Sequence, residues 1–255
     1  MAIDVAAAYK SPMQRVRVIS EAWASANLYC PCCPSRYLQP CSNNRQAIDF
    51  SCPQCLADFQ LKSCKSAFGK RIVDGAYSAM TKAIMSGGTP NLFALRYMSS
   101  DWTVADLTLV PRFAFTLSCL EKRPPLSPKA RRAGWIGCNI LLSNIPPDAR
   151  IALVCAGKVV PPSQVRNKLK LLQPLQSLDP IQRGWTLDIL KVVRRIGRQQ
   201  FTLKDIYEYV DDLQKLHPRN QHIHDKIRQQ LQILRDMRII NFLGEGRYSL
   251  ERLQS

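Results

Sequence analysis

Residues 30–62 read CPCCPSRYLQPCSNNRQAIDFSCPQCLADFQLK and contain the strongest structural signal in the chain. Two C-x2-C pairs are separated by 18 residues, a spacing typical of tetrahedral zinc held by four thiolates. Cys32 and Cys41 are competing candidates, and a set of buried thiols without a metal is the alternative. Because four protein ligands would leave no open coordination position, we expect a structural zinc. The predicted zinc ligands are Cys30, Cys33, Cys52 and Cys55.

The segment after the second cysteine pair alternates as a strand does. Gln60 and Lys62 share one face with Asp58, whereas the intervening apolar side chains point toward the core. A knuckle that folds back would bring Asp49 beside them. A carboxylate, a carboxamide oxygen and an amine that converge suit Mg²⁺-assisted phosphodiester hydrolysis, in which the metal polarises the phosphate. The predicted catalytic residues are Asp49, Gln60 and Lys62, with Asp49 and Gln60 as magnesium ligands.

This pattern resembles the PD-(D/E)xK nuclease signature, with two departures. Ile48 replaces the proline, and Gln60 stands where an acid is expected. A neutral amide oxygen lowers Mg²⁺ affinity unless Asp58, about 7 Å along the strand, or a DNA phosphate compensates. We therefore expect weakened rather than absent activity. The alternative is a solvated strand face with no catalytic role.

The charge balance points to a polyanionic partner. The 255 residues include 36 Lys and Arg against 19 Asp and Glu, which leaves a net charge of +17. Neutralising phosphates releases counterions, so nucleic acid is the expected partner. With 46% hydrophobic and 22% charged residues, the composition excludes a mainly disordered, collagenous or coiled-coil chain. All three histidines lie in the last quarter, which excludes a histidine-based hydrolytic triad in the first 200 residues.

The same sequence predicts a cytoplasmic protein. Its first residues lack a basic segment followed by an apolar core, and no stretch approaches 18 uninterrupted apolar residues. Ten cysteines without an export signal favour a reducing compartment with a metal site over disulfides. We expect no membrane association.

Hydrophobic periodicity and turn residues predict the elements of the N-terminal part. A proline-rich basic loop, residues 122–132, interrupts them. Helices are predicted over residues 11–27, 76–85 and 162–174, and strands over residues 47–50, 58–62, 92–98, 104–110, 135–142 and 150–156.

From Gly184 the pattern changes to three helices and a strand pair, which is typical of a winged helix-turn-helix. The expected division is a nuclease domain over 1–175, a linker over 176–183 and a winged helix over 184–255. Trp185 is interpreted as a core residue, with base contact as the alternative. The predicted elements are helices Trp185–Ile196, Thr202–Leu216 and His222–Met237 and strands Ile239–Leu243 and Arg247–Leu250.

The third of these helices has a buried stripe and an exposed polar face. Ile223, Ile227, Leu231 and Leu234 form the stripe. Glutamine and arginine commonly pair with adenine and guanine edges in the major groove. A solvated face without DNA contact is the alternative for each residue. The predicted DNA-binding residues of this part are His222, Arg228, Gln229 and Gln232, together with Arg247 of the wing near a phosphate.

Several longer runs, spread over almost the whole chain, resemble the DpnI-like methyl-directed, type IIM restriction endonucleases. The resemblance implies an α/β (α+β) PD-(D/E)xK nuclease core with an embedded zinc knuckle, followed by a small winged helix. It places the family catalytic positions on Asp49, Gln60 and Lys62 and the zinc positions on the four cysteines. The runs are Asn43-Asn44-Arg45, Leu61-Lys62-Ser63, Asp74-Gly75-Ala76-Tyr77, Ala130–Ile140, Arg183-Gly184-Trp185-Thr186 and Ile227–Asp236.

The resemblance further implies the substrate, which is double-stranded DNA with methylated adenine in GATC, cut to a blunt end. The adenine methyl group replaces a major-groove donor with apolar surface, so a reader should present an apolar or aromatic face. Trp135 is the candidate, with Arg131 and Arg132 on phosphates or guanine edges; a core tryptophan beside a basic surface loop is the alternative. We expect a monomer, and the resemblance implies the cytoplasm of a prokaryote. The rival functions are a non-catalytic methylated-DNA-binding regulator with a degenerate nuclease site and a repair nuclease indifferent to methylation.

Overall fold

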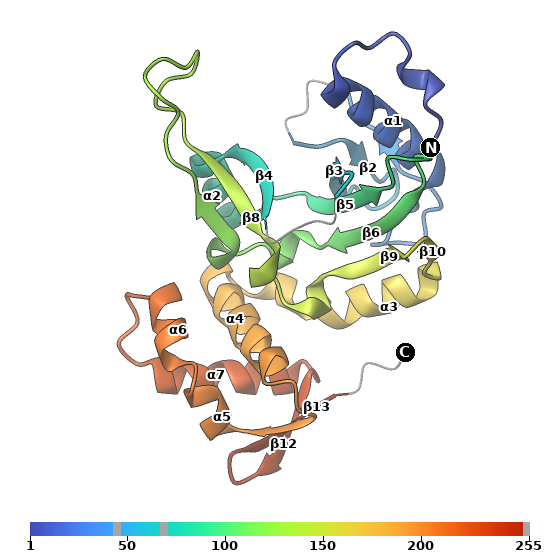
Figure 1. The fold of residues 1–255 in the computed structure, drawn as a ribbon. Coiled ribbons are helices and arrows are strands. Elements are labelled where there is room, and N and C mark those ends of the chain that lie inside the picture. The colour runs from blue at the N-terminus through green and yellow to red at the C-terminus, as the bar shows by residue number, and fades with distance from the viewer. Residues whose placement is uncertain (43–46, 67–70, 252–255) are drawn as a thin grey trace. The chain divides into compact units, whose positions relative to one another are not determined.

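The computed structural model describes residues 1–42, 47–66 and 71–251, so Asn43, Asn44 and Arg45 lie outside the described residues. The chain forms two compact units that alternate along the sequence (Figure 1). No helix in the described ranges is long and apolar enough to cross a membrane. The first unit comprises Met1–Gly69, Thr89–Arg112 and Ala149–Leu169, and the second comprises Lys70–Gly88, Phe113–Asp148 and Lys170–Ser255.

The first unit is built on a seven-stranded mixed sheet in the order β1-β2-β3-β5-β6-β9-β10. β3 pairs with β5 in parallel, whereas the other neighbours pair antiparallel. A parallel pair needs a long connection, and here the connection carries elements of the second unit. The strands are β1 (Gln39–Pro40), β2 (Phe50–Ser51), β3 (Asp58–Cys64), β5 (Asn91–Tyr97), β6 (Val104–Val110), β9 (Ile151–Cys155) and β10 (Lys158–Val159).

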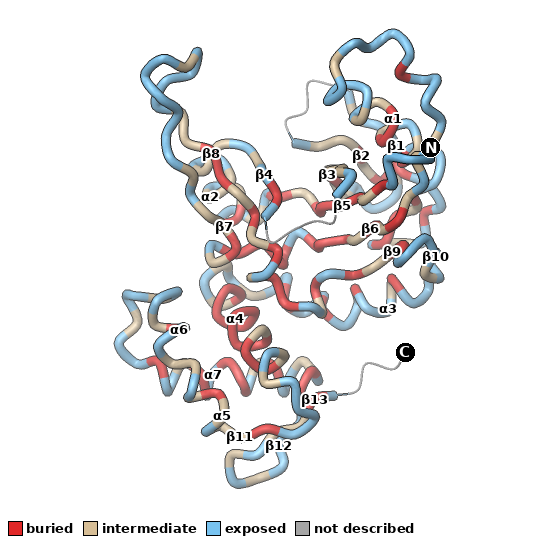
Figure 2. Tube along the Cα trace, viewed as in Figure 1, coloured by how far each residue is buried: buried red, intermediate tan, exposed pale blue. Residues whose placement is uncertain are grey.

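The core of this unit lies around the middle of the sheet. β5 is buried over almost its whole length (red in Figure 2), as expected of a central strand covered on both faces. Phe59 of β3 stacks on Phe93 of β5 with ring centroids 5.0 Å apart. Helix α1 (Pro12–Asn27) contacts β3 and buries Ile19, and α3 (Pro162–Leu172) buries Val165.

The second unit contains a small antiparallel sheet in the order β4-β8-β7. A long hairpin, residues 123–136, connects β7 to β8 without regular secondary structure, as predicted for the basic loop. The elements are β4 (Arg71–Ala76), α2 (Tyr77–Ser86), β7 (Leu120–Lys122) and β8 (Gly137–Leu141). The sequence did not predict β4, which contains Asp74-Gly75 and pairs with β8.

The same unit contains the winged helix-turn-helix, and the predicted fold class is confirmed. Its last helix, α7, is followed by a β-hairpin with three consecutive left-handed residues at Gly244, Glu245 and Gly246. A glycine-rich turn suits those dihedral angles. The elements are α4 (Pro180–Ile196), β11 (Gln200–Thr202), α5 (Leu203–Tyr207), α6 (Val210–Leu216), α7 (Ile223–Asp236), β12 (Ile240–Gly244) and β13 (Arg247–Leu250).

The prediction of one helix over Thr202–Leu216 is wrong. Thr202 pairs with Arg247 in β11–β13 and at the same time caps α5. Its hydroxyl accepts from the Asp205 N–H at 3.2 Å, while the Asp205 carboxylate accepts from the Thr202 N–H at 2.6 Å. This capping box fixes the helix start after Thr202. Helix α5 ends at Tyr207, and the separate helix α6 begins at Val210.

The predicted linker over 176–183 overlaps two helices, the end of the 3-10 helix Gln173–Ser177 and the start of α4. Helix α4 begins at Pro180, because the Asp179 carboxylate accepts from the N–H groups of Ile181 and Gln182, both at 2.9 Å. Trp185 is therefore one turn inside the helix; it is 3% exposed, in keeping with its interpretation as a core residue. The strand predicted over 47–50 begins only at Phe50, since Ala47 has a left-handed backbone with φ 58°.

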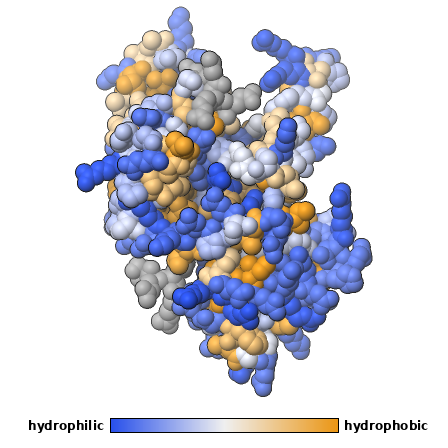
Figure 3. Space-filling model, turned by 180° about the vertical axis from the view of Figure 1, so that it is seen from behind, coloured by the Kyte–Doolittle hydropathy of each residue, from blue (hydrophilic) through white to orange (hydrophobic). Residues whose placement is uncertain are grey.

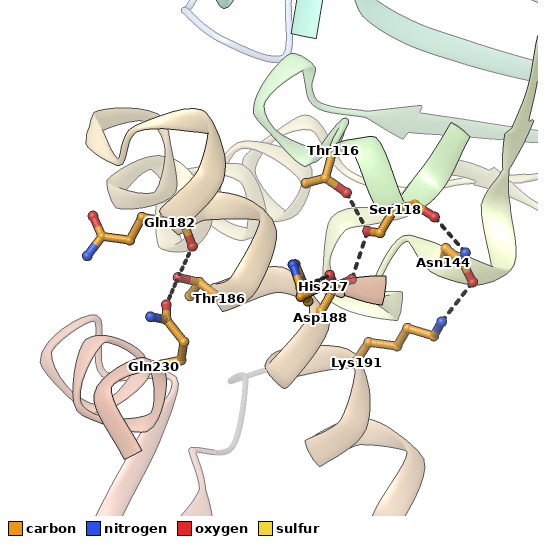
Figure 4. A network of polar contacts seen from close by, with 9 residues as sticks. All are labelled: Thr116, Ser118, Asn144, Gln182, Thr186, Asp188, Lys191, His217 and Gln230. Atoms are coloured by element: carbon orange, nitrogen blue, oxygen red, sulfur yellow. Dashed lines mark hydrogen bonds and ion pairs between the residues drawn. The ribbon is translucent and has the colours of Figure 1, made fainter. Parts of the chain in front are cut away.

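A buried polar network ties α4 to residues 113–148 within the second unit (Figure 4). Asp188 of α4 is 2% exposed and accepts from the Ser118 hydroxyl at 2.8 Å. Its other oxygen lies 2.9 Å from His217 Nε2, and the His217 ring stacks on Trp185 at 3.6 Å. Nearby, Lys191 donates to the Asn144 amide oxygen at 2.7 Å. Because a buried charge is tolerated only when it is hydrogen-bonded, these partners fix α4 in place.

Candidate functional site

The four predicted zinc ligands converge on one point. The sulfur atoms of Cys30, Cys33, Cys52 and Cys55 all lie within 4.8 Å of one another. Two of the Sγ–Sγ distances are 3.6 Å (Cys30–Cys55) and 3.4 Å (Cys33–Cys52). Thiolates at the usual Zn–S distance in a tetrahedron are about 3.8 Å apart, so this donor set fits zinc. Among the described residues, no other histidine, cysteine or carboxylate belongs to the group, and Cys32 and Cys41 are not part of it.

Tight turns of the main chain present the sulfurs. The Cys52 N–H donates to Ala57 O at 2.9 Å, and Leu56 within this turn has φ 57°. Burial disfavours the Cys52 thiolate, but N–H groups of Cys55 and Gln54 donate to its sulfur and lower the pKa of Cys52 to about 6. Metals bind the thiolate form, so these N–H groups favour the binding-competent state at Cys52, whereas burial raises the pKa of Cys33 and of Cys55.

Arg166 of α3 braces the first knuckle from outside. Its guanidinium donates to Cys30 O at 3.1 and 3.3 Å and to Ser35 O at 3.5 Å. It also lies 5.1 Å from the centroid of the Tyr29 ring. Sequence reasoning missed this residue, because its target is a main-chain carbonyl more than 130 residues away.

Strand register places the three predicted catalytic residues on one face of the sheet. Phe50 pairs with Phe59, and the Asp49 N–H donates to Phe59 O at 2.9 Å. Asp49 therefore lies opposite Gln60, on the side away from the two buried phenylalanines, and Lys62 follows two positions along the same face. Asp49 Oδ2 also accepts from the Leu61 N–H at 2.7 Å, which anchors the carboxylate between Gln60 and Lys62.

Helix α1 borders two pockets beside these residues. One pocket of about 330 Å³ is lined by Asp49, and another of about 620 Å³ is lined by Lys62. Arg17 and Glu21 line both pockets, and Arg17 Nε donates to Glu21 Oε1 at 2.6 Å. That hydrogen bond, with the charges of Glu21 and Asp49, raises the pKa of Arg17. Sequence reasoning did not single out this pair, although its i,i+4 spacing on a predicted helix was a usable signal.

The hairpin in the second unit carries the first group of predicted DNA-binding residues. Arg131 and Arg132 are exposed, and this hairpin stands out as a hydrophilic arm in Figure 3. Trp135 is partly buried, with the Arg132 guanidinium 5.8 Å from its ring centroid. The indole lies against Gly137, where a Cβ atom would come within 2.8 Å of two ring atoms. The Trp135 ring thus packs on the backbone of Gly137 at the start of β8, and part of its surface remains accessible.

The second group lies on the exposed side of α7 and on the wing. His222, Arg228, Gln229 and Gln232 are exposed, within an arc of about 120° at 3.6 residues per turn. Arg228 donates to Asp225 at 2.5 Å and to the Tyr207 hydroxyl at 3.1 Å, while Gln229 accepts from Lys226 at 2.8 Å. The opposite side buries the predicted apolar stripe together with Gln230.

Arg247 is exposed on β13 and lies 3.7 Å from Glu245 in the turn of the wing. The predicted site residues therefore fall into four groups. The cysteines and the catalytic candidates belong to the first unit, whereas the hairpin and the winged helix belong to the second.

Comparison with protein-family models shows to which family the chain belongs. The model of the Dam-replacing family, DpnI, matches residues 1–178, and the model of the Dam-replacing HTH domain matches residues 181–250. The chain belongs to the Dam-replacing family.

Membership of the Dam-replacing family confirms the DpnI-like, two-domain resemblance and implies a methylation-dependent restriction endonuclease. Its helix-turn-helix domain implies DNA binding. The two family matches meet near residue 180, inside the second compact unit rather than at its edge. The predicted division into residues 1–175 and 184–255 stays a prediction.

Proposed function

We propose that this chain is a Mg²⁺-dependent type II endonuclease that cleaves double-stranded DNA at GATC when the adenines are methylated, leaving a blunt break. One observation carries the proposal. The pairing of Phe50 with Phe59 sets Asp49 opposite Gln60, with Lys62 on the same face, in a member of a restriction nuclease family. We further propose that the protein acts as a monomer in the cytoplasm of a prokaryote.

The oxygen donors present fit magnesium. Mg²⁺ usually keeps several waters and binds through one or two carboxylates together with substrate phosphates. Asp49 would offer its carboxylate and Gln60 its amide oxygen from adjacent positions on one sheet face. When bound, the metal would polarise the phosphate and lower the pKa of a coordinated water.

The protein side chains would orient and stabilise the reacting groups. Lys62 would hold the attacking water and offset negative charge that develops on the phosphate. Hydrolysis forms a bond from the water oxygen to phosphorus and breaks one ester P–O bond, and the leaving oxygen takes up a proton. The Leu61 N–H, which donates to Asp49, is a main-chain group, so it holds that carboxylate in a fixed orientation. We propose that the four-cysteine zinc has a structural role only.

Methyl recognition is proposed for the second unit. Trp135 would present the accessible part of its indole to the two methyl groups, while Arg131 and Arg132 would contact phosphates or guanine edges. The exposed side of α7 would read the major groove, and Arg247 would contact a phosphate.

The test uses plasmid DNA from a host that methylates GATC and from one that does not. Incubation of the zinc-loaded protein with Mg²⁺ should fragment only the methylated plasmid. Equal cutting of both would remove the methylation requirement and leave the repair nuclease. Binding of the methylated plasmid without cutting would leave the regulator, the second candidate, which Gln60 favours because it removes one acid from the site.

Replacement of the proposed lysine tests the site itself. Lys62→Ala should lose cleavage of methylated plasmid while its zinc content and its affinity for methylated duplex remain. Lys158→Ala, which removes an exposed lysine on β10, is the matched control and should cut normally. Retained cleavage by Lys62→Ala would show that other residues carry the reaction.

A further inference from the structure

We propose that Glu21 of α1 supplies the second carboxylate of the divalent-cation site, in the role that the neutral side chain of Gln60 leaves unfilled. This inference rests on the proposed function, because it assigns a further ligand to the same cation. It concerns a residue of helix α1 in the first unit, whereas Asp49 directly precedes β2 and Gln60 lies in β3.

The position of Glu21 is the first argument. It lines the pocket that Asp49 lines and also the pocket that Lys62 lines. Among the described residues that line these two pockets, Glu21 and Asp49 are the carboxylates. The helix contacts β3, so Glu21 approaches the site from α1, while Asp49 approaches from the segment just before β2.

The present partner of Glu21 is the second argument. Arg17 donates to Glu21 at 2.6 Å, and the charge of Asp49 acts on the same guanidinium. The structure thus already places one cation in contact with Glu21 and within reach of the charge of Asp49. The Arg17 side chain is 58% exposed, so solvent screens its ion pair with Glu21 and that pair contributes little. A divalent cation would replace it, because two carboxylates attract a double charge more strongly than a single one.

The other nearby acid is less suitable. Asp58 shares the strand face of Gln60, but it pairs with Ser51 and lies about 7 Å along the strand from Gln60. Asp58 lines neither pocket, as is also true of Gln60, whereas Glu21 lines both. Glu21 is therefore a better candidate than Asp58 for the second carboxylate, although it comes from a helix. Two carboxylates and one amide oxygen would restore the charge that Mg²⁺ prefers in a protein site.

The experiment measures cation binding apart from cleavage. Mn²⁺ is titrated into the full-length, zinc-loaded protein, and free Mn²⁺ is followed by electron paramagnetic resonance. Glu21→Gln should weaken Mn²⁺ binding by about tenfold or more, since affinity follows the number of ligand charges. Adding Gln60→Glu to the same chain should restore binding, because the acid returns on the strand. Glu208→Gln, which removes an equal charge from an exposed position of the second unit, is the matched control.

The outcomes separate this inference from the proposed function. If Asp49→Asn loses Mn²⁺ binding while Glu21→Gln matches Glu208→Gln, the assignment of Glu21 is overturned and the nuclease site stands. If the unaltered protein neither binds Mn²⁺ nor cuts methylated DNA, both fail. Should Glu21→Gln unfold, as judged by zinc content and circular dichroism, Glu21→Asp keeps the charge on a shorter side chain. A weakened Mn²⁺ affinity in that variant supports the assignment, and an unchanged one overturns it.

Discussion

Arg166 shows how one side chain can secure a metal site without touching the metal. Its guanidinium donates to the main chain on both sides of the first knuckle, at Cys30 and Ser35, and covers the Tyr29 ring. Burial raises the pKa of Tyr29 to about 12 against the opposing charge of Arg166. The arginine thus orients the Cys30 backbone while its own charge rests on an aromatic face.

Replacing this arginine should loosen the zinc. Arg166→Met keeps much of the aliphatic packing but loses the hydrogen bonds, and we expect zinc to transfer to a chelator about tenfold faster or more, as for other residues that support metal ligands. Arg150→Met, at an exposed position of the same unit, should release zinc at the original rate. The measurement is zinc transfer to a chromogenic chelator, and equal rates for the two variants would contradict the bracing role.

The elements of the winged helix depend on their end residues. The capping box between Thr202 and Asp205 stops β11 and starts α5 within one residue. The N–H and then the hydroxyl of Thr202 donate to the Asp205 carboxylate, and both lower the pKa of Asp205 below its usual 3.8. The native state therefore binds fewer protons than the unfolded state around that pH, so this contact stabilises the fold above pH 3.8 and is lost as the pH falls further.

Asp205→Asn should destabilise the protein in a pH-dependent way. At pH 7 we expect a loss of about 1 kcal/mol, the usual effect of removing a helix cap. The difference from the unaltered protein should shrink as the pH is lowered below 3.8, because the unfolded state takes up the proton first and the native state follows at lower pH. Urea unfolding at pH 7 and pH 3 measures it. Asp211→Asn, at an exposed position of α6, serves as control; a deficit of Asp205→Asn that stays constant with pH would contradict the prediction.

Long periodic elements could be predicted from the sequence, and short or interrupted ones could not. The helix beginning at Pro12 and the strand over 104–110 agree with the prediction, because a proline at the first turn and strict alternation are local signals. β4 and β7 were missed because tertiary pairing with β8 makes them strands.

The residues of the candidate site also differ in how far the sequence alone could predict their positions. The cysteine cluster follows from spacing within 26 residues, and the face shared by Gln60 and Lys62 follows from strand alternation. The opposition of Asp49 to Gln60 needed the register of two strands. Glu21 could not be placed beside them from sequence, since only the packing of α1 on β3 brings it there.

In the whole molecule, the proposed reading elements share one compact unit. The hairpin over 123–136 and the winged helix both belong to the second unit, and the Asp188 network joins α4 to Ser118. The family boundary near residue 180 is thus crossed by buried contacts. Arg183, inside the predicted linker, is 6% exposed and donates to Leu178 O at 3.1 Å.

Trypsin should therefore cut the hairpin before it cuts the predicted linker. Lys129, Arg131 and Arg132 are exposed in a segment without regular secondary structure, whereas Arg183 is buried in α4. Brief digestion should yield two fragments of about half the chain each, as judged by mass spectrometry. Methylated duplex should slow that cut if the hairpin contacts DNA. First fragments that end at Arg183 would instead support a flexible connection between two independent domains.

The alternation of the two units along the chain has a consequence for biosynthesis. A nascent polypeptide released after residue 112 would contain the four cysteines, Asp49 and strands β3, β5 and β6, yet it would lack β9 and the helices that follow. The first unit is complete only once Leu169 has been added, and the second only once Ser255 has been added, so the first cannot mature before about two thirds of the chain has been made. Premature termination would consequently produce a fragment that has the thiolates for zinc without a finished apparatus for engaging a chromosome.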